Sequence, residues 1–66
     1  MERFDVFVVG APYGPDEVVE AGDMARCLRW VQRELLPGQR ALIKDQDDEL
    51  VRMLECGPDG TVDLEP

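Results

Sequence analysis

Apolar and polar residues near the start of the chain predict a β-strand. Residues 3–9 read Arg-Phe-Asp-Val-Phe-Val-Val, and β-branched and aromatic residues of this kind favour strands. Both faces of the segment are apolar after Asp5, so we expect a central strand. Two glycines and two prolines in residues 10–15 end it. Residues 16–22 are compatible with one helical turn or with an ordered loop.

The apolar residues of the next segment repeat with the period of an α-helix, over residues 23–36. Asp23 is a favourable N-cap, and Pro37-Gly38 ends the segment. The helical period places one set of apolar side chains on a single arc, namely Met24, Cys27, Leu28, Val31 and Leu35. It places three arginines on the opposite side, namely Arg26, Arg29 and Arg33. The pattern therefore predicts an amphipathic helix whose apolar side packs on a sheet.

Three further strands are predicted in the remainder of the chain, over residues 40–44, 49–56 and 61–65. Turn-forming residues separate them at 45–48 and 57–60. In the last strand we expect the side chains of Val62 and Leu64 to point inward, and those of Thr61, Asp63 and Glu65 to point outward. The predicted order is β-α-β-β-β. This is an α+β fold of one compact domain over residues 1–66, with a small, mostly antiparallel sheet and the helix packed on one face.

The length and the apolar content limit the kinds of site that the chain can build. Its 66 residues lie near the lower limit for a domain that folds without a metal or several disulfides. The apolar fraction of 44% is sufficient for a core. Because that core is small, we expect binding to use an outer surface and not an enclosed cavity.

The residue types that are missing argue against most catalytic chemistry. The chain has no His and no Ser, which excludes an imidazole base and a serine nucleophile. Two cysteines without His cannot supply the four ligands of a zinc site. We therefore expect no enzyme, no metal and no cofactor. Catalysis would have to use carboxylates or a thiol, and Cys27 and Cys56 are interpreted as reduced, partly buried thiols, or as one disulfide if the chain is secreted.

No apolar stretch of the chain approaches the roughly 20 residues that span a bilayer, so no membrane association is predicted. A charged Glu2-Arg3 follows Met1 directly, which is unlike a secretory signal. The expected compartment is the cytoplasm.

The negative charge is concentrated in the C-terminal third of the chain. The net charge is −8, from 15 acidic and 7 basic residues. Residues 1–44 carry seven acidic and six basic side chains, whereas residues 45–66 carry eight acidic side chains and only Arg52. A protein of this charge repels nucleic acids and anionic membranes, and its expected partner is a basic, nucleic-acid-binding protein.

The acidic side chains of the C-terminal segment form the predicted partner-binding face. On a strand, alternate side chains share one face at about 6.6–6.8 Å, a spacing comparable with that of successive phosphates. Such a row would occupy the Lys and Arg side chains with which a protein holds phosphates. The alternative is that acidic residues cap turns, protect an edge strand and maintain solubility. The predicted residues are Asp45, Asp47, Asp48, Glu49, Glu55, Asp59, Asp63 and Glu65.

Trp30 and the three arginines of the helix form a possible second contact. Trp30 lies at the edge of the apolar arc, beside Arg26, Arg29 and Arg33. Trp and Arg dominate interface hot spots, so this side of the helix is a candidate contact with a partner or with a second copy in a weak homodimer. The other interpretation, which we favour, is that Trp30 covers the core and the arginines pair with acidic neighbours.

The chain resembles the small phage-encoded anti-CRISPR proteins, and most of all an inhibitor of type I-C systems. The resemblance runs from Glu2-Arg-Phe-Asp-Val-Phe-Val-Val-Gly10 to the acidic C-terminal segment, and it rests on length, acidity and element order. Several members of that group mimic DNA and occupy the basic PAM-reading or DNA-holding surface of a Cas effector subunit. The resemblance implies this role, in the cytoplasm of a host bacterium, for the acidic residues named above. The arginine stripe departs from a uniformly acidic mimic, so one side of the molecule alone would imitate DNA.

Overall fold

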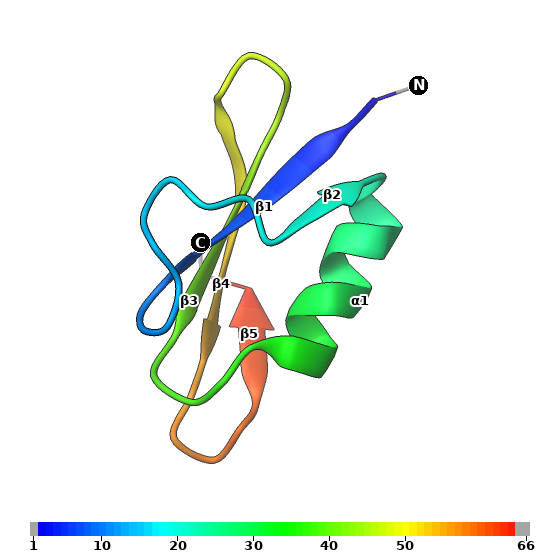
Figure 1. The fold of residues 1–66 in the computed structure, drawn as a ribbon. Coiled ribbons are helices and arrows are strands. Elements are labelled where there is room, and N and C mark those ends of the chain that lie inside the picture. The colour runs from blue at the N-terminus through cyan, green and yellow to red at the C-terminus, as the bar shows by residue number, and fades with distance from the viewer. Residues whose placement is uncertain (1, 65–66) are drawn as a thin grey trace.

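Five antiparallel strands form one sheet in the order β2-β1-β3-β4-β5, and one helix lies on one side of it (Figure 1). The computed structural model describes residues 2–64. The predicted α+β class is confirmed, and the predicted order gains one strand. The elements are β1 (Phe4–Val9), β2 (Glu20–Gly22), α1 (Met24–Glu34), β3 (Arg40–Lys44), β4 (Leu50–Cys56) and β5 (Val62–Leu64).

The additional strand is β2, in a segment for which the sequence favoured a helical turn or a loop. It pairs antiparallel with β1, with Val6 opposite Glu20 and Phe4 opposite Gly22. Its composition, Glu-Ala-Gly, carries no strand signal. The return of the chain alongside β1 imposes the extended conformation, and the φ of 153° at Gly22 is one that glycine adopts without strain.

The core lies between α1 and one face of the sheet, which we call the helix-side face. Cross-strand partners share a face, so Val8 of β1, Ala41 of β3 and Leu54 of β4 form one buried row. The opposite face, which we call the open face, carries the half-buried row Phe7, Leu42 and Met53. The other buried side chains of the core are Phe4, Val6, Cys27, Trp30, Val31, Leu35, Ile43 and Cys56.

The helix begins where the sequence predicts and ends two residues earlier. The Asp23 side chain accepts a hydrogen bond from the Arg26 amide at 2.8 Å, as expected of an N-cap. Leu35 is already extended, with φ −70° and ψ 127°, and its amide donates to the Val31 carbonyl. The side chain of Leu36 is 55% exposed. Within residues 2–64, no helix is long and apolar enough to cross a bilayer.

One buried polar side chain attaches the loop of residues 10–19 to the rest of the fold. Gln39 is 4% exposed. Its Oε1 accepts from the Leu36 amide at 2.8 Å, and its Nε2 donates to the Ala11 carbonyl at 2.7 Å. Farther along the loop, the ring of Tyr13 packs edge-on against Trp30, with centroids 6.2 Å apart.

The last strand is less buried than its alternation predicts. Val62 and Leu64 do belong to the helix-side face, because Leu64 lies opposite the buried Leu54. However, α1 packs mainly against β1 and β2 at the other end of the sheet. Val62 is half-buried, and Leu64 is 58% exposed, so the expectation that Leu64 points into the core is wrong.

Candidate functional site

The acidic residues predicted as one face lie in two groups at opposite ends of β4. Four belong to the turn between β3 and β4, and three lie at the other end, on β4, β5 and the turn between them. A strand of seven residues separates the two turns by roughly 20 Å. Figure 1 shows the two turns at opposite ends of β4. Glu65 lies outside the described residues. The first group is Asp45, Asp47, Asp48 and Glu49, and the second is Glu55, Asp59 and Asp63.

The start of the chain adds two carboxylates to the first group. Asp5 lies opposite Lys44 in the ladder of β1 and β3, next to the turn. Glu2 lines a hollow of about 240 Å³ together with Arg3 and residues 45–47. Sequence reasoning missed both carboxylates, because they are some 40 positions distant and only the strand register brings them here. We call this group the acidic end: Glu2, Asp5, Asp45, Asp47, Asp48 and Glu49.

Within the acidic end, Asp45 forms the turn that presents its neighbours. Its Oδ1 accepts hydrogen bonds from the amides of Asp47, at 2.9 Å, and Glu49, at 3.0 Å. Asp48 has a φ of 63°, in the left-handed region that Asp and Asn tolerate better than most residues. The Asp45 carboxylate is therefore engaged by the turn. The exposed side chains of Asp47, Asp48 and Glu49 carry the outward charge.

Two cations lie among these six carboxylates, which leaves the acidic end with a net charge of −4. Lys44 Nζ is 3.5 Å from Asp48 Oδ1 and 4.9 Å from the centroid of the Phe7 ring. Arg3 Nε is 3.6 Å from Asp5 Oδ1. Each pair joins one exposed and one half-buried side chain, and the buried Asp5 Oδ1 has no hydrogen-bond partner among the described residues. The side chains of Asp47 and Glu49 have no hydrogen bond or ion pair among residues 2–64.

The second acidic group is mostly committed to the structure. Asp59 Oδ1 accepts from the Thr61 amide at 3.0 Å, and this hydrogen bond lowers the pKa of Asp59. Glu55 Oε2 is 3.5 Å from Arg40 Nη2. Asp63 is exposed and has no ion-pair partner within residues 2–64. This group therefore offers an incoming partner less free charge than the acidic end does.

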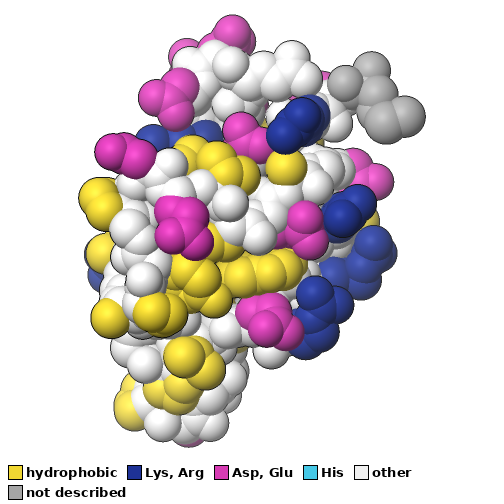
Figure 2. Space-filling view, in the orientation of Figure 1, with side chains coloured by type: hydrophobic (Ala, Val, Ile, Leu, Met, Phe, Trp, Pro, Cys, Tyr) yellow, Lys and Arg dark blue, Asp and Glu magenta, His cyan; other side chains and the backbone are white. Residues whose placement is uncertain are grey.

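The three arginines of the helix, Arg26, Arg29 and Arg33, lie on the helix side of the molecule. Figure 2 shows Lys and Arg side chains gathered over α1, and acidic side chains at the end formed by the β3–β4 turn. Arg33 Nε lies 3.1 Å from Glu34 Oε2, whereas Arg29 has no ion-pair partner among the described residues. Trp30 is only 9% exposed. Most of its ring therefore belongs to the core, which favours the structural interpretation over a contact anchor.

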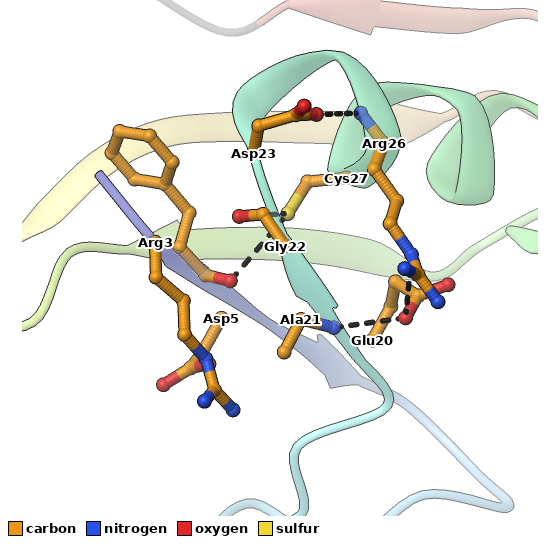
Figure 3. Close-up of polar contacts among 9 residues, drawn as sticks. Arg3, Asp5, Glu20, Ala21, Gly22, Asp23, Arg26 and Cys27 are labelled. Atoms are coloured by element: carbon orange, nitrogen blue, oxygen red, sulfur yellow. Dashed lines mark hydrogen bonds and ion pairs between the residues drawn. The ribbon is translucent and has the colours of Figure 1, made fainter. Parts of the chain in front are cut away.

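Arg26 takes part in a local network that joins α1 to β2 (Figure 3). Its Nε is 3.4 Å from Glu20 Oε1, which also accepts from the Ala21 amide at 3.0 Å. The backbone hydrogen bond from Ala21, and then the Arg26 charge, lower the pKa of Glu20. Arg26 is thus used to fix the start of the helix.

The two cysteines are free and buried, with 0% and 1% of their surfaces exposed. Cys27 Sγ lies 3.6 Å from the Phe4 carbonyl and 3.8 Å from the Gly22 carbonyl (Figure 3). Burial raises the pKa of the Cys27 thiol, and the nearby Glu20, Asp23 and Asp5 raise it further. A nucleophilic cysteine requires the opposite shift, so the surroundings of Cys27 disfavour thiolate chemistry.

Comparisons with protein-family models, with curated proteins and with solved structures found no match to this chain. No relative's activity therefore bears on the acidic end.

Proposed function

We propose that the protein acts by binding a basic, nucleic-acid-binding protein through its acidic end, without catalysis. The observation that supports this proposal best is the geometry of the β3–β4 turn. It exposes Asp47, Asp48 and Glu49 at one end of the elongated molecule, and among the described residues Lys44, 3.5 Å from Asp48, is the one cation that pairs with any of the three. A partner that holds phosphates through Lys and Arg would find exposed carboxylate oxygens there.

The specific form of the proposal is an anti-CRISPR protein that blocks DNA or PAM binding by a type I CRISPR effector subunit. It rests on the resemblance in length and acidity, together with the acidic end. The test is a gel-shift titration of purified type I-C effector complex on duplex DNA that carries its PAM and target. Added protein should prevent the shift at near-stoichiometric ratios. An unchanged shift at a large excess of protein would reject the anti-CRISPR form.

A matched pair of variants tests whether the acidic end is responsible. The triple variant Asp47→Asn, Asp48→Asn, Glu49→Gln removes three outward charges and keeps Asp45, which forms the turn. The control triple variant Asp16→Asn, Glu17→Gln, Glu34→Gln removes the same charge from exposed positions elsewhere. We expect the first to lose about tenfold in affinity for the partner, from three exposed charge contacts. The control should lose less than about threefold.

The open face of the sheet supports a second candidate function, an interaction module that associates with itself. Phe7, Leu42 and Met53 are only half-buried there, and Val9 beside them is 53% exposed. Apolar surface of this kind is typical of contact sites. Sedimentation velocity over a range of concentrations tests this function: a concentration-dependent dimer that salt does not dissociate supports it, and a monomer throughout rejects it.

A further inference from the structure

The strand β5 leaves hydrogen-bonding groups free at one edge of the sheet. Among residues 2–64, no strand pairs with its outer edge. The Gly57 amide donates to the Thr61 carbonyl at 2.8 Å, which sets the alternation of the ladder between β4 and β5. In that alternation, the backbone amides and carbonyls of Asp63 and Glu55 form a hydrogen-bonded pair. The amides and carbonyls of Val62 and Leu64 therefore point outward.

The opposite edge of the sheet differs from β5. On β2, the Ala21 amide is occupied by Glu20 Oε1 at 3.0 Å, and Arg26 holds that carboxylate (Figure 3). An added strand would have to displace this network. The edge at β5 requires no such displacement, because the outward backbone groups of Val62 and Leu64 have no hydrogen-bond partner among the described residues.

Asp63 determines which strand can be added at the β5 edge. Its side chain is exposed and lies beside Glu55, in the open-face row that also contains Arg40. A residue placed opposite Asp63 by an added antiparallel strand would form a non-hydrogen-bonded pair, in which side chains are closest. Like charges directly opposite each other destabilise such a pair, and opposite charges stabilise it. A second copy in full register would place Asp63 opposite Asp63, so self-pairing is disfavoured.

The side chains that flank Asp63 favour apolar neighbours. Val62 and Leu64 lie on the helix-side face, and Leu64 is 58% exposed there. A segment that alternates apolar and basic residues would cover Leu64 on this face and neutralise Asp63 on the open face.

We propose that β5 is a docking edge for an extended segment of a partner protein, with Lys or Arg opposite Asp63 and apolar residues beside Val62 and Leu64. This mode of recognition is β-augmentation, in which the backbone supplies affinity and alternate side chains supply specificity. The edge lies at the far end of β4 from the β3–β4 turn. It is thus a contact additional to the acidic end, and the two can be tested separately.

The test uses two eight-residue peptides, one of alternating valine and lysine and one of alternating valine and glutamate, at physiological salt. The valine–lysine peptide should slow hydrogen exchange of the Val62 and Leu64 amides, as followed by NMR. Asp63→Lys should lower the affinity for the valine–lysine peptide by about fivefold and raise the affinity for the valine–glutamate peptide. The proposal would be overturned if the valine–lysine peptide left hydrogen exchange at both amides unchanged. It would also be overturned if Asp63→Lys still preferred the valine–lysine peptide to the valine–glutamate peptide.

Two substitutions at Leu64 separate the backbone contribution from the side-chain contribution. Leu64→Pro removes the outward amide, and proline is tolerated at an edge position. We expect it to lower the affinity for the valine–lysine peptide by about fivefold. Leu64→Ala keeps the amide and should weaken it less. Equal losses of peptide binding in the two variants would contradict backbone hydrogen bonds between the peptide and β5. A dimer of the unmodified protein that Leu64→Pro abolishes would also overturn the proposal, in favour of a second copy at this edge.

The triple variant of the acidic end distinguishes this inference from the proposed function. With Asp47→Asn, Asp48→Asn and Glu49→Gln, the valine–lysine peptide should still protect the Val62 and Leu64 amides. Loss of that protection would show that the peptide binds the acidic end, and it would remove β5 as the site.

Discussion

Replacement of Gln39 by leucine should destabilise the protein by an amount that the structure specifies. Gln39 is 4% exposed, and its amide makes two short hydrogen bonds, from the Leu36 amide at 2.8 Å and to the Ala11 carbonyl at 2.7 Å. Leucine has a similar volume, so the packing is preserved while both bonds are lost. Each such bond contributes about 0.5–1.5 kcal/mol net. We therefore expect Gln39→Leu to lower the free energy of unfolding by about 1–3 kcal/mol.

Urea denaturation followed by the fluorescence of Trp30, the single tryptophan, measures this loss. The control is Gln32→Leu, at an exposed position of α1, which should change stability by less than about 0.5 kcal/mol. A loss in Gln39→Leu no larger than in this control would refute the reasoning. It would mean that the loop of residues 10–19 is held by other contacts, such as the packing of Tyr13 on Trp30.

Two further predictions concern side chains with assigned structural roles. Trp30→Ala should lower the free energy of unfolding by about 3–5 kcal/mol, because the ring is buried, and urea denaturation monitored by circular dichroism measures this loss. The control Arg29→Ala should change it by less than about 0.5 kcal/mol. Similar losses in the two variants would contradict the burial of Trp30. The hydrogen bond from Thr61 lowers the pKa of Asp59 from 3.8, so its stabilisation is present above that pH and is lost as the pH falls through the lowered folded value. Asp59→Asn keeps a hydrogen-bond acceptor and removes the titrating carboxyl, so the stability of this variant should fall less steeply than that of the wild type between about pH 4 and pH 2. Equal slopes of the free energy of unfolding against pH, measured by urea denaturation, would argue against this linkage.

The strands and the helix that carry their own periodic signal could be predicted from the sequence. Residues 40–44 form β3 with the predicted bounds, and Asp23 caps α1 as expected. The strand β2 could not be predicted, because a Glu-Ala-Gly segment becomes extended only through its pairing with β1. The exposure of Leu64 was missed for a related reason, since alternation indicates a face but not how far the helix covers it.

The candidate site could be predicted only in part. The density of carboxylates in residues 45–49 is evident in the sequence. Its separation from Glu55, Asp59 and Asp63 depends on the length of β4, and the addition of Glu2 and Asp5 depends on the register of β1 against β3. These are long-range relationships that a local pattern does not contain.

The central claim, that the acidic end binds a basic nucleic-acid-binding protein, is tested most directly by comparing the two triple variants in a capture experiment. Tagged wild type and both variants would be incubated with bacterial lysate, and retained proteins would be identified by mass spectrometry, with and without added duplex DNA. The account predicts that wild type and the Asp16, Glu17, Glu34 control retain the same basic nucleic-acid-binding protein. It also predicts that added DNA displaces this protein and that the Asp47, Asp48, Glu49 variant retains clearly less of it than the control does. Equal retention by both variants, or retention that DNA does not reduce, would contradict the account.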